Sequence, residues 1–129
     1  MDRALIIVPT YNERDNVEPL AQQILEQHPA FEVLFVDDSS PDGTGDLVRT
    51  MSADTARIHS MHRPAKSGLG TAYVDGFRWA LARDYQLVFE MDADFSHHPK
   101  YLVPMAETAM AGADMVVGSR YVTGGGTLN

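Results

Sequence analysis

Two hydrophobic patterns alternate along the chain. Short runs rich in apolar residues occur at 4–8, 31–36, 58–61, 87–91 and 115–117, and such runs are typical of strands buried on both faces. Between them, apolar residues recur at helical spacing within 17–25, 73–81 and 102–110, and a weaker helix is expected over 45–51. This alternation predicts an α/β fold with a mostly parallel central sheet, right-handed crossovers and helices on both faces.

Local signals set the expected boundaries of these elements. Pro9 is expected to end the first strand in a turn. Asn16 is a candidate cap for a helix whose first turn contains Pro19, and Pro99 suits the first turn of the last helix. Residues 123–129, which include three successive glycines, have the composition of a flexible tail.

Composition narrows the classes of function. The 129 residues are 44% apolar and 22% charged, which predicts a single folded domain over residues 1–129. The net charge of −8 argues against nucleic acid as a partner, because binding it requires a basic surface. The chain has no cysteine, so disulfides and zinc-thiolate sites are excluded. No run is long or apolar enough for a signal peptide or a membrane span, so we expect a soluble, cytoplasmic chain.

Polar residues follow every expected strand, which is where open α/β sheets bind their ligands. They are residues 9–13 after the first strand, 37–42 after the second, 63–70 after the third, 92–94 after the fourth and 118–120 after the fifth. Because parallel strands end at the same edge of a sheet, we expect polar groups from five segments to converge there.

Asp92 and Asp94 give this edge a candidate metal site. The period of two along a strand places both carboxylates on one side. They form either a solvated strand end or a pair that repels unless a cation lies between them. Mg²⁺ or Mn²⁺ suits such a pair, because these ions take oxygen ligands and share them with substrate phosphates. The adjacent His97 and His98 lack the spacing of zinc ligands and favour capping or hydrogen bonding.

Three further segments leave two interpretations open. Residues 38–44 are turn formers, which suit a turn and helix cap as well as a ligand site. Tyr11 has either a structural role or a contact with a base. Residues 66–70 match neither the dinucleotide nor the P-loop pattern, yet Arg63 and Lys66 beside a helix N-terminus can attract a phosphate or a carboxylate.

Five ordered blocks of the chain resemble family 2 glycosyltransferases. The blocks are VPTYNE at 8–13, VDDSSPDGT at 36–44, GLGTAY at 68–73, MDADFSHHP at 91–99 and GSRY at 118–121. Within the family, the GLGTAY and SHHP runs are similar to those of dolichol-phosphate or polyprenol-phosphate mannosyltransferases. The resemblance extends from Val8 to about Gly126.

The resemblance implies a GT-A fold, a GDP-mannose donor, a polyprenyl monophosphate acceptor at a membrane surface, and inversion at the anomeric carbon. It implies that the guanosine is held by Pro9, Tyr11, Glu13, Val36 and Asp38, and that the D-x-D element Asp92, Ala93 and Asp94 meets the diphosphate and Mg²⁺ or Mn²⁺. Arg120 would face the phosphates or the acceptor. Ser96 stands where some relatives have a Gln that also meets the metal, which predicts a weaker or water-mediated contact.

Members of this family continue well beyond the GSRY block into a part that handles the lipid. We therefore expect an N-terminal fragment that forms the donor half-site and transfers mannose weakly or not at all by itself. Its longer form would lie at the cytoplasmic face of a membrane, through a C-terminal membrane part or a membrane-protein partner. Two alternatives stay open, namely a family 2 transferase with another nucleotide-sugar donor, such as a UDP-sugar, and a non-catalytic nucleotide-binding fragment.

Overall fold

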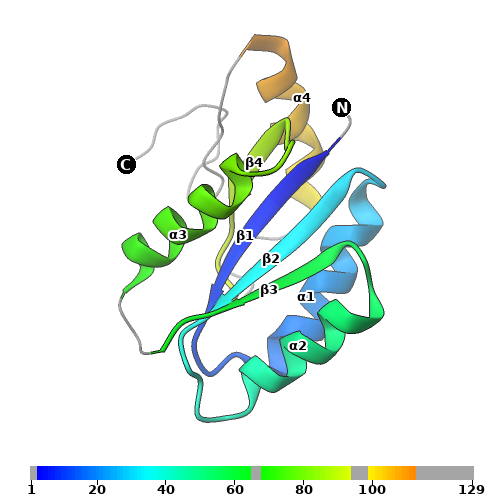
Figure 1. Ribbon diagram of the computed structural model, residues 1–129. Coiled ribbons are helices and arrows are strands. Elements are labelled where there is room, and N and C mark those ends of the chain that lie inside the picture. The colour runs from blue at the N-terminus through cyan, green and yellow to red at the C-terminus, as the bar shows by residue number, and fades with distance from the viewer. Residues whose placement is uncertain (1–2, 65–67, 94–98, 113–129) are drawn as a thin grey trace.

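The computed structural model describes residues 3–64, 68–93 and 99–112. Its elements in chain order are β1 (Ala4–Thr10), α1 (Arg14–Gln27), β2 (Phe31–Asp37), α2 (Thr44–Asp54), β3 (Ile58–His62), α3 (Leu69–Leu81), β4 (Leu87–Glu90), the 3-10 helix η1 (Pro99–Tyr101) and α4 (Leu102–Gly112). The strands form one parallel sheet in the order β3-β2-β1-β4 (Figure 1), which confirms the predicted α/β architecture. The fifth expected strand at 115–117 and the tail at 123–129 lie outside the described residues.

Helices cover both faces of the sheet, as predicted. Alternate residues of a strand point to opposite faces, so Ile6 and Val8 pack with α1, α2 and α4 while Leu5 and Ile7 pack with α3. Figure 1 shows α3 on the side of the sheet opposite α1 and α2. Gly76 allows α3 to approach β1 closely, because a Cβ at this position would lie 2.7 Å from Ile7 Cγ2. We refer below to the α3 face and the α1 face of the sheet.

The first strand does not end at Pro9, so the predicted turn there was wrong. β1 continues to Thr10, and Pro9 pairs in register with Val36 of β2. The Met91 N–H donates to the Ile7 carbonyl, so the odd residues of β1 direct their backbone groups towards β4. Pairing with β4 ends at Ile7, so the N–H that proline lacks falls beyond the last pair and the strand tolerates it.

The start of α1 also differs from the expectation. The helix begins at Arg14 and has Glu13 as its N-cap residue, so Asn16 is not the cap and Pro19 lies inside the helix. Side chains from the loop after β2 accept the exposed N–H groups instead. The bonds run from Asn12 N to Ser40 Oγ at 2.9 Å, from Glu13 N to Thr44 Oγ1 at 3.0 Å, and from Arg14 N to Asp42 Oδ2 at 3.2 Å. These partners lie about thirty residues away in sequence, beyond the range of a local capping signal.

Candidate nucleotide-binding site

The order of the strands reverses between β1 and β4, and we refer to the region beyond the carboxyl ends of these two strands as the crevice. The chain passes from β1 to β2 and β3, and then returns through α3 to the other side of β1. In open parallel sheets, ligands bind beyond the carboxyl ends of the strands at such a reversal. The paired register of the two strands ends at Ile7 and Glu90, with a further bond from the Met91 N–H to the Ile7 carbonyl. The segments that follow carry Pro9 and Tyr11 after Ile7 and Asp92 after Glu90.

Three of the residues assigned to the nucleotide by resemblance, Pro9, Val36 and Asp38, lie on the α3 face of this edge. Leu34 and Val36 of β2 pack on that face, and the same alternation places Asp38 there. Pro9 pairs with Val36, and the Asp38 N–H donates to the Thr10 carbonyl at 3.2 Å, so the two strand ends are neighbours. Tyr11 follows on the surface, 37% exposed. The sequence prediction that separate segments converge on one edge is confirmed for β1 and β2.

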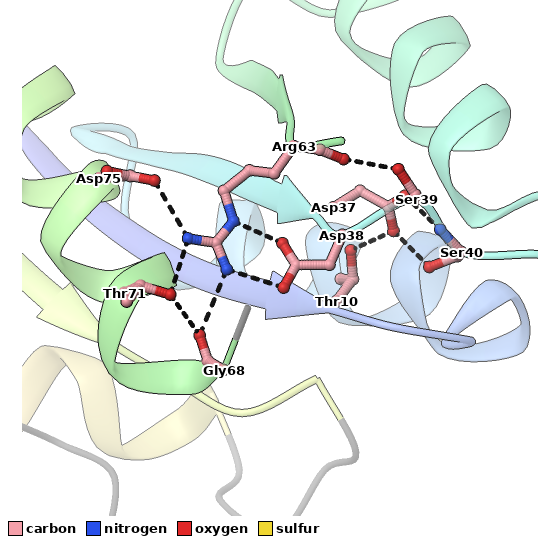
Figure 2. A network of polar contacts seen from close by, with 9 residues as sticks. All are labelled: Thr10, Asp37, Asp38, Ser39, Ser40, Arg63, Gly68, Thr71 and Asp75. Carbon is pink, nitrogen blue, oxygen red and sulfur yellow. Dashed lines mark hydrogen bonds and ion pairs between the residues drawn. The ribbon is translucent and has the colours of Figure 1, made fainter. Parts of the chain in front are cut away.

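Arg63, the residue that follows β3, connects this edge to the first turns of α3 (Figure 2). Its Nε and Nη2 donate to the two oxygens of Asp38 at 2.6 and 2.8 Å. Its Nη1 donates to Thr71 Oγ1 at 3.0 Å and to Asp75 Oδ2 at 3.1 Å, and Nη2 also donates to the Gly68 carbonyl at 3.3 Å. All five N–H groups of the guanidinium therefore have acceptors within the protein.

This network shows which groups Arg63 binds within the protein. The expectation was that Arg63 attracts a phosphate or a carboxylate, and the structure pairs it with two carboxylates of the chain itself. The hydrogen bonds that Arg63 donates to Asp38 raise the pKa of Arg63 above its ordinary value and outweigh a smaller opposing effect of burial. Both side chains of the Arg63–Asp38 pair are 8% exposed. Lys66, the other candidate cation, lies outside the described residues.

The segment 38–44 proves to be divided between two roles. Asp37 accepts hydrogen bonds on the α1 face from Thr10 Oγ1 at 2.7 Å and from Ser40 Oγ at 2.6 Å, which fixes the loop (Figure 2). Asp42 accepts from the backbone N–H groups of Arg14 and Thr44. Burial raises the pKa of Asp42, but a hydrogen bond from the Thr44 hydroxyl, together with these backbone bonds, outweighs burial and holds the pKa below its ordinary value. The turn and cap interpretation therefore describes most of the segment, while Asp38 lies on the α3 face against Arg63.

The end of β4 supplies acidic groups to the crevice. Asp92 is half-buried and accepts a hydrogen bond from the Tyr73 hydroxyl of α3 at 3.3 Å. Burial, and after it the negative charge of Asp92, raises the pKa of Glu90. Sequence analysis missed Glu90, although the period of two that grouped Asp92 with Asp94 places it on the same side of the strand. Two neighbouring carboxyl groups offer the oxygen ligands that a hard divalent cation prefers.

Within the described part of the chain, no three histidine or acidic side chains gather as a ready metal site. Asp94, the second carboxylate of the expected metal pair, lies outside the described residues, as do His97, His98 and Arg120. The ion-binding part of the prediction therefore rests on Asp92 and its surroundings alone.

Two other residues predicted to contact the nucleotide lie elsewhere. Glu13 lies at the start of α1, and Ala93 lies in the core. Glu13 accepts from Asn16 Nδ2 at 2.9 Å, and its N–H donates to Thr44, so it is engaged at the start of α1. Ala93 is buried and packs in the core of the α1 face. A contact of Ala93 with a diphosphate would therefore be made by its backbone.

Fold and site together define a class: an α/β domain whose acidic crevice lies where the strand order reverses, as in domains that bind nucleotides there. The particular family follows from comparison of sequences. The chain belongs to Glycosyl transferase family 2, whose sequence profile matches residues 5–129.

Two curated relatives narrow the comparison. A polyprenol monophosphomannose synthase from Mycolicibacterium smegmatis is 48% identical over 128 residues, which cover 98% of this chain and 48% of the relative. An undecaprenyl-phosphate mannosyltransferase from Micrococcus luteus is 47% identical over 127 residues, covering 98% of this chain and 52% of the relative. The chain thus spans about half the length of these relatives.

A solved structure has a similar fold. The mannosyltransferase PcManGT from Pyrobaculum calidifontis, solved in complex with GDP-Man and Mn²⁺, superimposes with a TM-score of 0.62 at 30% identity. The match covers 71% of this chain and 27% of that one. It supports the GT-A assignment of the parallel sheet and its helices.

Proposed function

We propose that this chain forms the donor-binding part of a glycosyltransferase that moves a mannosyl group from GDP-mannose to a polyprenyl monophosphate with inversion. The observation that carries the proposal is the position of Glu90 and the half-buried Asp92 at the carboxyl end of β4, beside β1, where the strand order reverses. The names of the two curated relatives and the ligands of PcManGT support the same donor and acceptor.

The donor would lie along the carboxyl edge of the sheet. Pro9, Tyr11, Val36 and Asp38 would hold the guanosine on the α3 face, and Glu13 would complete that pocket after a change in its present contacts. The carboxylates of Asp92 and Asp94 would hold Mg²⁺ or Mn²⁺ against the diphosphate, with the Ala93 backbone beside them. When bound, the ion neutralises charge on the departing nucleoside diphosphate.

The acceptor side needs no strong general base in this chain. A lipid phosphate has a second pKa near 6, so it is already largely anionic at pH 7 and can attack the sugar directly. Arg120 would face the phosphates or the acceptor. None of the helices in the described part of the chain combines the length and the apolar character that crossing a bilayer requires. Contact with the lipid at the cytoplasmic face would involve further membrane-associated parts or partners.

Calorimetry with GDP and Mn²⁺ tests the donor site. The parent chain should bind GDP in an Mn²⁺-dependent manner, and Asp94→Ala should weaken this by at least about a hundredfold, because a single carboxylate holds the ion poorly. Asp84→Ala, which removes an exposed carboxylate after α3, is the matched control and should bind as the parent does. If Asp94→Ala binds GDP and Mn²⁺ like the parent, the assignment of the metal site is wrong. A parent that prefers UDP to GDP would favour a different nucleotide-sugar donor.

A further inference from the structure

Arg63 joins three segments that lie far apart in sequence. It follows β3, its guanidinium pairs with Asp38 after β2, and its remaining donors reach Thr71, Asp75 and the Gly68 carbonyl in the first turns of α3 (Figure 2). Because every N–H group has an acceptor within the protein, Arg63 is built into the edge of the sheet and does not extend into the crevice.

The geometry of this pair fixes the orientation of a carboxylate. Two parallel N–H···O bonds, at 2.6 and 2.8 Å, reach both oxygens of Asp38, so the plane of the carboxylate follows the plane of the guanidinium. Thr71 and Asp75 hold the opposite side of the guanidinium, which orients it against α3. A lysine at position 63 would keep the positive charge but would lose the planar arrangement of donors.

We propose that Arg63 is a positioning residue for recognition of the nucleoside, acting through Asp38. The inference rests on the proposed function, in which Asp38 meets the base of the donor. A correctly oriented carboxylate accepts hydrogen bonds from N–H groups of a base, and the two bonds that Arg63 donates fix the orientation of Asp38. The diphosphate is assigned to Asp92 and Asp94, which follow a different strand. A change at Arg63 therefore affects the nucleoside end of the ligand and leaves the diphosphate end intact.

Two probes separate these ends in a calorimetric experiment with Mn²⁺. GDP reports on both ends, and inorganic pyrophosphate reports on the diphosphate end alone. Arg63→Lys should weaken GDP binding about tenfold, as expected for the loss of a charge-assisted hydrogen-bond pair, with pyrophosphate binding unchanged. Arg57→Lys is the matched control. The half-buried Arg57 donates to the carbonyls of Phe31, Leu25 and His28 away from the crevice, so this variant should leave binding of both probes unchanged.

A second variant keeps the test independent of folding. Asp75 is 39% exposed, so Asp75→Asn should fold, and loosening the guanidinium should weaken GDP binding about threefold without affecting pyrophosphate. The inference is overturned if Arg63→Lys binds GDP as the parent does, or loses GDP and pyrophosphate binding in equal proportion, as general damage to the structure would cause. Should Arg63→Lys not fold, an unchanged GDP-to-pyrophosphate ratio in Asp75→Asn overturns it. A parent that binds pyrophosphate but not GDP would instead overturn the proposed function.

Discussion

The two ends of the sheet both carry charged clusters on the α3 face, and the clusters are built in opposite ways. At the amino ends of the strands, three donors converge on one carboxylate, that of Glu32. Arg3 Nε donates at 2.9 Å and the Tyr85 hydroxyl at 2.7 Å, while His59 Nε2 lies 2.8 Å away. Trp79 of α3 stacks on Tyr85, with ring centroids 6.0 Å apart. At the carboxyl ends, a single guanidinium is shared by two carboxylates.

The balance of charge distinguishes the two clusters. Burial alone would raise the pKa of Glu32, but the hydrogen bonds from Arg3, Tyr85 and His59 outweigh it and lower the pKa to about 2. The negative charge of Glu32 is therefore stabilised by hydrogen-bond donors within the amino-end cluster. At the other end, burial and after it the negative charge of Asp92 raise the pKa of Glu90. Hydrogen-bond donors therefore lower the pKa of a carboxyl group at the amino end of the sheet, whereas burial and a like charge raise one at the carboxyl end.

The largest effect is expected from Arg63→Met. Removal of the guanidinium leaves the buried carboxylate of Asp38 without its partner, and breaking such a pair lowers the free energy of unfolding by about 3–5 kcal/mol. Urea unfolding at pH 7 measures this loss. A loss below about 1 kcal/mol is typical of an exposed ion pair, and it would contradict the burial of the Arg63–Asp38 pair.

A smaller effect is expected from Glu32→Gln at the amino end. This substitution weakens several charge-assisted bonds at a site 14% exposed, and about 1–3 kcal/mol of stability should be lost. It also changes the dependence of stability on pH. Because the folded-state pKa is about 2 and the ordinary value is 4.5, the contribution of Glu32 is complete above pH 4.5 and disappears as the pH falls towards 2. Urea midpoints of parent and variant should therefore converge between pH 5 and pH 2, and parallel curves would contradict this.

The smallest effect is expected from Asp42→Ala in the loop between β2 and α2. This carboxylate accepts from the backbone N–H groups of Arg14 and Thr44, and loss of a helix cap removes about 1 kcal/mol. A shift in the thermal midpoint, with GDP affinity retained, would agree with a purely structural role for Asp42. An unchanged midpoint would show that the bonds to Arg14 and Thr44 do not stabilise the start of α1.

The parts of the fold that depend on short-range pattern were predictable. Apolar runs located the four described strands, and helical spacing located α1, α3 and α4. The predictions for Pro9 and Asn16 failed because strand ends and caps were decided by partners in another loop. β1 continues past Pro9 because its register with β2 extends to Thr10 and Asp37. The start of α1 is capped by residues such as Asp42, about thirty positions away in sequence.

The candidate site stays a prediction that rests on the rule that ligands lie beyond the carboxyl ends of parallel strands. The sequence blocks predicted the family, which the comparison of sequences confirms. The pairing of Asp38 with Arg63, 25 residues apart, had no signal in either residue's neighbourhood. Glu90 did have a signal, because it is two residues before Asp92 on the same strand.

The most direct test of the account is the position of manganese in crystals of this chain grown with GDP and Mn²⁺. Anomalous diffraction locates the ion independently of any assumption about the ligand. We predict a peak within coordination distance of the Asp92 carboxylate, between the ends of β1 and β4, with the diphosphate bound to the same ion and the base beside Asp38. GDP bound elsewhere, or a crevice without manganese when GDP is bound, would contradict it.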